Sequence, residues 1–234
     1  MRKIVILGVA IAALAQISSA ATCTSGTLAG YIGLGSSGCT IGSDTLSSFQ
    51  LLAGTTGATE IAAANVLLSP TGASANPGLI TSVNVVSMTG SVQETLFTYQ
   101  LSGSSYNSAA ISLSNASESG DGAVTGLLNF CAGGAFGADG VSACTGVTGG
   151  LATVDGAQNQ DSAAFTPVNL LSITNDLTID GGTAGSATGG ALFEQFGATA
   201  TATPEPISVW LTGIGLALVA VRRLKFSGTG VVRK

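Results

Sequence analysis

The chain has 234 residues, of which 34 are Gly and only 8% are charged. All seven Lys and Arg lie at positions 2, 3, 222, 223, 225, 233 and 234, and there is no His. Residues 22–203 hold every acidic residue except Glu205, eleven of the twelve, without one cationic residue. Nucleic acid is therefore not expected as a partner, because phosphate binding needs Lys or Arg. A catalytic triad is also excluded there, because it needs a His or Lys base.

The N-terminus has the pattern of a secretory signal peptide. Arg2 and Lys3 precede an apolar run at 4–14, and small residues follow at 18–21. We expect cleavage after Ala20, with Ala21 as the alternative, so that residues 1–20 form the signal peptide. A permanent anchor is not expected, because eleven apolar residues at ~1.5 Å each cannot cross ~30 Å of hydrocarbon.

Four Cys residues form two close pairs in the sequence, Cys23 with Cys39 and Cys131 with Cys144. An exported chain folds in an oxidising compartment, so disulfides are expected. Three connectivities are possible, and we expect local pairing, in which each bond closes a loop of about 15 residues. A metal site is the alternative, but CxxC spacing and His are both missing.

Segments with period-two alternation predict short β-strands separated by turns. Only residues 60–68, which are rich in Ala, could form a helix, and Ser69-Pro70 would end it. The fold class expected for residues 21–197 is therefore all-β, an antiparallel β-sandwich with Gly-rich loops. The strands are expected at 45–53, 81–88, 95–103, 109–117, 150–156, 163–180 and 185–196, with turns at 54–57, 72–78, 103–107 and 181–185.

Four acidic residues precede a glycine, at Asp121, Asp139, Asp155 and Asp180, a pairing typical of turns. Without a basic residue, any catalysis would depend on carboxyl groups alone. Because turns explain these residues better, we expect no catalytic residue, no cofactor site and no enzymatic activity.

Calcium is the one ligand for which the sequence offers candidates. Residues 155–161 read DGAQNQD and place the oxygen donors Asp155, Asn159 and Asp161 on one loop. The alternative is a solvated acidic turn.

A second apolar run lies near the C-terminus. A polar spacer at 198–203 leads to Pro204-Glu205-Pro206, and fifteen uncharged residues at 207–221 precede Arg222 and Arg223. As a helix this run would reach ~22 Å, short of the ~30 Å hydrocarbon core, so a lasting anchor is marginal. The basic residues after it follow the positive-inside pattern and leave the acidic domain outside.

This order of parts resembles the bacterial PEP-CTERM sorting signal over residues 204–225. The resemblance implies that Pro204, Glu205 and Pro206 are the recognition motif. It implies one C-terminal transmembrane helix at 207–221, with Arg222 and Arg223 as the cytoplasmic stop. The implied partners during export are an exosortase and the inner membrane, followed by delivery to the cell surface or the extracellular space. The expected cytoplasmic tail at 226–234 is longer than such signals usually have.

Residues 23–42 and 163–187 also resemble one recurring group of PEP-CTERM proteins. That resemblance implies the pairing Cys23–Cys39 and a β-sandwich, and it carries no known activity. We therefore expect an exosortase-processed, non-catalytic structural protein of the surface, extracellular matrix or biofilm, with exopolysaccharide or matrix proteins as partners. The alternative is a glycan- or calcium-binding extracellular module.

Overall fold

The computed structural model describes residues 20–73 and 76–199, which form an all-β fold as predicted. The predicted signal peptide (apart from Ala20), residues 200–203 of the spacer, the sorting signal and the tail lie outside the described residues. The first two residues of the predicted spacer, Ala198 and Thr199, instead belong to the last strand, because they pair with Tyr106 and Ser105. Among the residues described, helical structure is limited to the five-residue α1 (Leu28–Ile32) and the 3₁₀ turn η1 (Ala63–Asn65), and no helix is long and apolar enough to cross a membrane. The strands are β1 (Ala21–Thr22), β2 (Gly26–Thr27), β3 (Cys39–Ile41), β4 (Asp44–Leu51), β5 (Thr59–Glu60), β6 (Val66–Thr71), β7 (Gly78–Val83), β8 (Val86–Met88), β9 (Val92–Ser114), β10 (Ser117–Ser119), β11 (Ala123–Ala132), β12 (Val147–Val154), β13 (Gln160–Asp180), β14 (Ser186–Thr188) and β15 (Ala191–Thr199).

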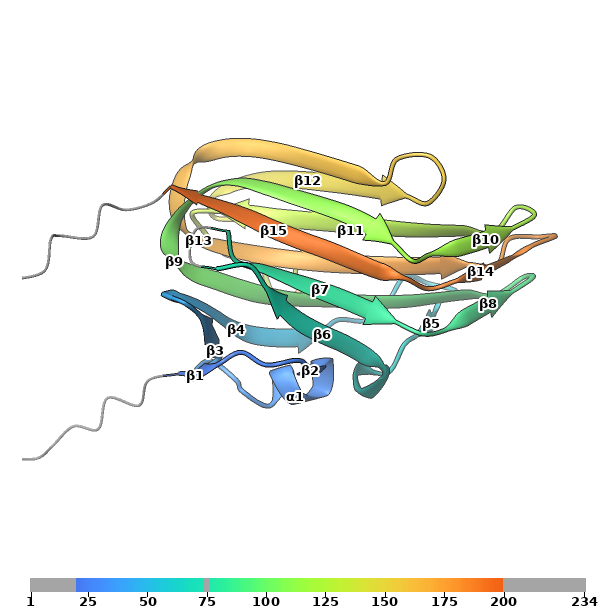
Figure 1. Cartoon of the computed structure of the whole chain (residues 1–234), viewed down its shortest axis with the longest axis horizontal. Coiled ribbons are helices and arrows are strands. Elements are labelled where there is room, and N and C mark those ends of the chain that lie inside the picture. Colours follow the sequence, from blue (N-terminus) through green and yellow to red (C-terminus); the bar gives the residue numbers. More distant parts are fainter. Residues whose placement is uncertain (1–19, 74–75, 200–234) are drawn as a thin grey trace, which may run out of the picture. The chain divides into compact units, whose positions relative to one another are not determined.

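Two long antiparallel strands, β9 and β13, run through the whole fold. They pair from Val92 opposite Asp180 to Ser112 opposite Gln160. The other edge of β9 pairs with β4 in its first half and with β15 in its second half. The first half of β9 and the last half of β13 thus form a first layer with β4, β11 and β12. Their remaining halves form a second layer with β15, β7 and β6, and the sheet curls between the two (Figure 1).

The expected turn at 103–107 is wrong, because these residues lie inside β9. Pairing with β13 continues through this stretch, with register shifts opposite residues 164–170. Gly103 has φ of +136°, and a Cβ atom there would come within 2.8 Å of Ser43 O and Asp44 Oδ1. Such a residue in a strand marks an irregularity where the strand bends. The turn-like composition therefore marks the passage of β9 from one layer to the other.

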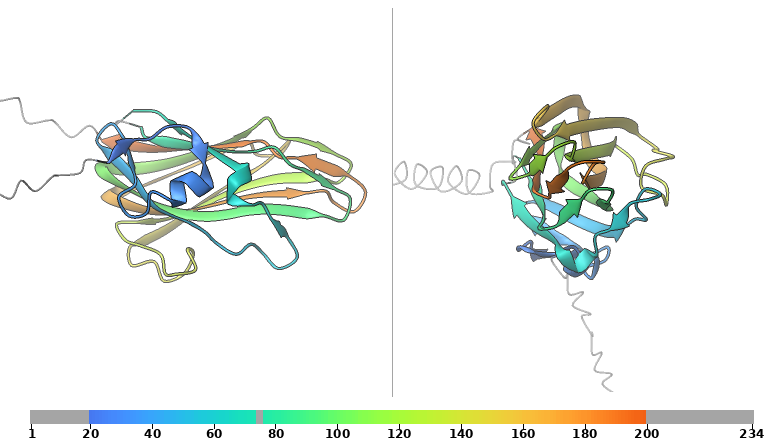
Figure 2. Two further views of the ribbon diagram at one scale, coloured as in Figure 1. Left: turned by 90° about the horizontal axis from the view of Figure 1, so that it is seen from below. Right: turned by 90° about the vertical axis from the view of Figure 1, so that its right-hand side faces the viewer.

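The N-terminal segment closes the curled sheet. β1 pairs with β3 at one end of the strand order, and β2, four residues later, pairs with β6 at the other end. A disulfide between Cys23 and Cys39 fastens this segment to β3. Seen from its end, the domain shows strands curling around a common interior (Figure 2). α1 follows directly and buries Leu28 and Tyr31 against that interior.

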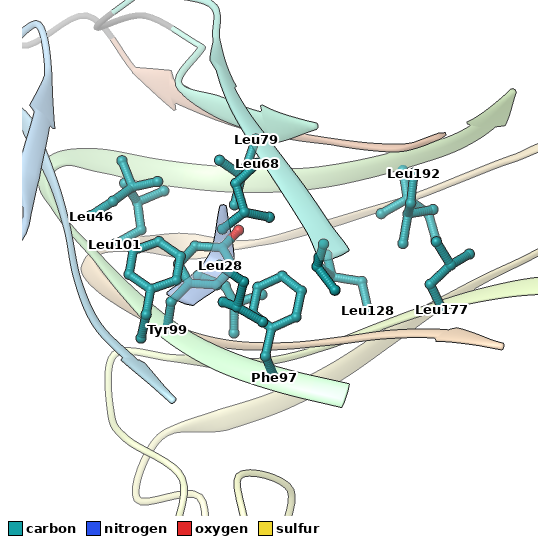
Figure 3. Packing of buried hydrophobic residues seen from close by; sticks show 14 of the residues in the cluster. Leu28, Leu46, Leu68, Leu79, Phe97, Tyr99, Leu101, Leu128, Leu177 and Leu192 are labelled. Carbon is teal, nitrogen blue, oxygen red and sulfur yellow. The ribbon is translucent and has the colours of Figure 1, made fainter. Parts of the chain in front are cut away.

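The interior is filled by the alternate residues of the strands. Phe97, Tyr99 and Leu101 of β9 are at most 1% exposed, and the residues between them are half-buried on the outside. Leu177 from the first layer and Leu192 from the second meet the same core (Figure 3). The period of two in the sequence therefore marks the inner face of both layers, as expected.

The outer face of the first layer is covered by two segments that follow β4 and β11. Leu52 and Ile61 of the first segment are buried, and Glu94 of β9 lies beneath it. The second segment, residues 133–146, is tied to the layer by the disulfide between Cys131 and Cys144. Local pairing of all four cysteines, including Cys23 with Cys39, is therefore confirmed.

Residues 60–68 do not form the helix that their alanines allow. They contain β5, the short turn η1 and the start of β6, and β6 continues to Thr71 through Pro70. Pro70 is paired with Leu79 of β7 only, because the pairing with β2 reaches no further toward Pro70 than Gly26 opposite Leu68. A proline tolerates such a position, where no further strand needs its missing N–H.

Removal of the closing disulfide tests the role of the N-terminal segment. The variant C23S/C39S is expected to lower the free energy of unfolding by about 3 kcal/mol, because the bond closes a loop of about 15 residues in the unfolded chain. Urea denaturation of the oxidised wild type and the variant measures the loss. The matched control is C131S/C144S, which opens a loop of similar size on the outer face. A closing disulfide that contributed nothing would leave C23S/C39S as stable as the wild type.

Candidate functional site

An open groove of about 650 Å³ lies on the outer face of the second layer. It crosses β13, β9 and β15 and reaches the end of β6. Its volume falls within the ~300–1,000 Å³ of small-ligand sites. The lining residues are Thr71, Ala110, Ile111, Ser112, Gln160, Asp161, Ser162, Phe193, Glu194 and Gln195.

Strand register builds this groove from two rows of outward residues. In one row Gln160 of β13 lies opposite Ser112 of β9, which lies opposite Phe193 of β15. The next row holds Ser162, Ala110 and Gln195, and it continues through Gly78 to Thr71. Small side chains at the centre of both rows leave room beside Phe193 and Gln195, and this difference in size creates the hollow.

Uncharged polar groups dominate the groove. Gln160, Ser162 and Gln195 are exposed, and Phe193 is half-buried. Of the two acidic residues in the lining, Glu194 turns its side chain into the core, where it is 0% exposed. The carboxylate of Asp161 accepts hydrogen bonds from Ala152 N at 3.0 Å and Ser162 N at 2.8 Å.

Beneath the groove, Glu194 is the centre of a buried hydrogen-bond network that joins the two layers. Tyr99 of β9 donates its hydroxyl to Oε2 at 2.6 Å, and Thr81 of β7 donates to Oε1 at 3.3 Å. Asn175 of β13 donates from Nδ2 to Oε1 of Glu194 and to Thr81 Oγ1. All four side chains are at most 1% exposed. The strand that carries Phe193 and Gln195 is thereby fastened to the opposite layer.

Burial changes the acid–base behaviour of this network. Loss of hydration raises the pKa of Glu194 from 4.5 to about 7, and the hydrogen bonds from Tyr99, Asn175 and Thr81 lower it in part. Burial and the neighbouring Glu194 also raise the pKa of the Tyr99 hydroxyl well above its usual range. A carboxyl group with such a shift is often functional, but this one is closed off from solvent and has a structural role.

Two further carboxyl groups, those of Glu94 and Asp176, lie near the segment that follows β4 and covers the first layer. Glu94 is 1% exposed, and its two oxygens accept hydrogen bonds from the backbone N and the hydroxyl of Thr55. The pKa of Asp176 is raised to about 6, mainly by burial and secondly by the charge of Glu94. A hydrogen bond from Thr178 lowers it in part. Through Thr55, Glu94 holds the covering segment in place.

The three calcium candidates lie around the tight turn that joins β12 to β13. Asp155 N donates to Val124 O, and Asn159 O accepts from Leu113 N. Asp161 is at the start of β13, where its carboxylate is bound to two backbone N–H groups. No group of three or more His, Cys, Asp or Glu side chains able to hold a metal ion is found in the described part of the chain. Calcium binding at these residues stays a prediction.

The predicted turn role of the Asp-Gly pairs agrees with the structure. Asp139 Oδ1 accepts from Val141 N and Ser142 N, and Asp180 Oδ1 accepts from Gly182 N. Asp121 binds a neighbouring turn through Thr183 and Ala184. Hydrogen bonds from these two residues, the Thr183 hydroxyl first, lower the pKa of Asp121 to about 2. These carboxylates are occupied in stabilising the loops.

Sequence reasoning did not find the groove. Its residues come from segments more than 30 positions apart, and only the pairing of β13, β9 and β15 brings them together. The signal in the sequence was limited to Phe193 and Gln195, which flank a buried Glu194 in period-two alternation. An outward aromatic residue on a strand is a possible binding position, but the sequence does not show what lies beside it.

Comparison with known proteins adds little. No family model matches the chain, and no curated protein matches it. One similar solved structure is that of TmCBM61 in complex with β-1,4-galactotriose, at 9% identity and a TM-score of 0.25, covering 54% of this chain and 85% of that one. A TM-score this low does not establish a common fold, and the likeness carries no functional argument.

The raised pKa values predict a protein that is more stable in acid. Protonated Glu194 and Asp176 favour the folded state, so their contribution is fully present below about pH 4 and is lost as pH rises through about 6 and 7. The melting temperature should therefore decrease as the pH is raised from 4.5 to 8. The variant E194Q should flatten the upper part of this decline, with E118Q on the surface as the matched control. An unchanged slope in E194Q would contradict the assignment.

The hydroxyl of Tyr99 is expected to contribute to the free energy of unfolding separately from the packing of its ring. In Y99F the packing stays, but Glu194 Oε2 loses its donor in a buried site. Such an unsatisfied group costs about 1–3 kcal/mol, and urea denaturation at pH 8, where Glu194 is ionised, should show the loss most clearly. Y31F is the matched control, because its hydroxyl binds a backbone carbonyl near the surface. Equal losses in both variants would argue against a special role for the network.

Proposed function

We propose that this chain is an exported, non-catalytic structural protein of the bacterial cell surface or extracellular matrix, such as a biofilm matrix. The observation that carries the proposal is the combination of two disulfides with a domain that lacks any cationic residue. Disulfides form and persist in oxidising compartments outside the cytoplasm. A surface whose charged side chains are all carboxylates keeps the domain soluble, because these groups repel those of other molecules.

The positions of the acidic groups support a non-catalytic function. The carboxyl groups of Glu194 and Glu94 are at most 1% exposed, and their oxygens are bound to other side chains or to the backbone. A general acid or base must come within hydrogen-bond reach of the substrate proton that it transfers. Neither buried group can do so. Asp161 borders the groove, but it is opposite Ile111, between the two outward rows, and its carboxylate is bound to Ala152 N and Ser162 N.

Delivery to the surface is proposed from the sequence of the C-terminal region. Pro204, Glu205 and Pro206 would be the motif that an exosortase recognises, and residues 207–221 would hold the chain in the inner membrane until cleavage. In this proposal the membrane-spanning residues are absent from the mature protein, and the folded β-domain is the part that acts outside.

The sorting step can be tested by substitution of the motif. In P204A/E205A/P206A, the exported protein should stay in the membrane fraction with residues 207–221 attached, because the motif for cleavage is missing. Intact-mass measurement on protein from cells with and without exosortase gives the readout. The matched control is the spacer variant T201A/T203A, which should be processed as the wild type is. A wild-type product that still carries residues 207–221 would overturn the proposal in favour of a permanent anchor.

A further inference from the structure

We propose that the groove across β13, β9 and β15 is a binding site for a neutral glycan, with Phe193 as its platform. The inference deepens the proposed function and rests on it in one respect, because a surface or matrix protein meets polysaccharide as its main neighbour. The site itself is argued from the residues that line it.

The shape around Phe193 suits a sugar ring. The side chain is half-buried, projects outward from β15, and has Ser112 as its neighbour on β9. In the adjacent row, Ala110 and Ser162 are small, so the space beside the aromatic ring is open. One face of a pyranose consists of C–H groups and packs against an aromatic surface, while its hydroxyls project around the rim.

The rim of the groove supplies the hydrogen-bonding groups that such hydroxyls need. Gln160 and Gln195 stand on opposite sides of it, and each amide carries both a donor and an acceptor. Within the described residues no hydrogen bond engages either side-chain amide, so both are available. Ser162 and Thr71 add hydroxyl groups that donate and accept. Ligand sites typically combine an apolar contact with a few polar groups of this kind.

Charge selects among glycans. No cation lies within residues 22–203, so an acidic polysaccharide would find no counter-charge at the groove. The chemistry therefore favours an uncharged oligosaccharide.

The buried network makes the site rigid before a ligand arrives. Glu194 lies between Phe193 and Gln195 on β15, and its bonds to Tyr99 and Asn175 fasten this strand to the first layer. β15 is also paired with β9 and β7 along its two edges. A platform held in this way loses little conformational freedom on binding. The outer face of the first layer offers no equivalent, because the segments at 52–61 and 133–146 cover it.

The test is titration calorimetry on the exported protein as purified from producing cells. The probes are neutral hexasaccharides of β-1,4-linked glucose, galactose and mannose, with an oligogalacturonate of the same length as the acidic probe. At least one neutral probe should give saturable heat at one site. F193A should weaken its binding about tenfold or more, and F193Y should retain it. V147A, which shortens an exposed apolar side chain on β12, is the matched control, and thermal melting verifies that every variant is folded.

Three results would overturn the proposal: no heat with any neutral probe, equal binding of the acidic probe, or binding that F193A leaves unchanged in a folded protein. A sedimentation equilibrium that shows a dimer in the wild type and a monomer in F193A would also overturn it, because the groove would then be an interface between copies. Surface delivery of F193A is measured in parallel by the intact-mass assay. Normal sorting with failed glycan binding would remove this inference and leave the proposed function standing.

Discussion

The structure depends on the pairing of β9 with β13, which runs through both layers and changes register where the strands bend. Within residues 20–73 and 76–199, these two strands alone belong to both layers, so their bend sets how the layers face each other. The other strands of the large sheet are attached to one half of this pair, either directly or through neighbouring strands, and β10, β14 and β8 form a separate three-stranded sheet. Gly103 allows the bend because a side chain there would collide with Ser43 and Asp44. A domain whose layers share two strands does not need a long linker to connect them.

A second constraint is the absence of any positive charge from the folded domain. Buried carboxylates are usually paired with Lys or Arg, and this domain has none to offer. Glu194 is held by the hydroxyls of Tyr99 and Thr81 and by an amide, and Glu94 is held by Thr55. Asp44, which is 0% exposed, accepts from Tyr106 Oη at 2.7 Å and from Ser104 N. Neutral donors replace ion pairs at these groups, and the raised pKa of Glu194 links the stability of the domain to pH.

The two outer faces of the domain differ, because one is covered by loop segments and the other is open. Two segments cover one face, one of them through the bond between Cys131 and Cys144 and the other through Thr55 on Glu94. The other face carries a row of small residues with Phe193 and Gln195 projecting beside them. In the proposed function, the protein needs a stable body and a surface for its neighbours. The covered face contributes to the first, and the groove is suited to the second.

The sequence by itself determined the all-β class, the positions of β4, β12 and β13, the turn role of the Asp-Gly pairs and the local disulfides, but it did not predict β11. These features depend on contacts near in sequence, such as alternation along one strand or two cysteines 16 positions apart. It failed at residues 103–107, where turn-like composition marks a bend within β9, and at residues 60–68, where pairing with β7 outweighed the helix propensity of alanine. The Glu194 network and the groove were decided only by the tertiary structure, because each assembles side chains from strands that meet through long-range register.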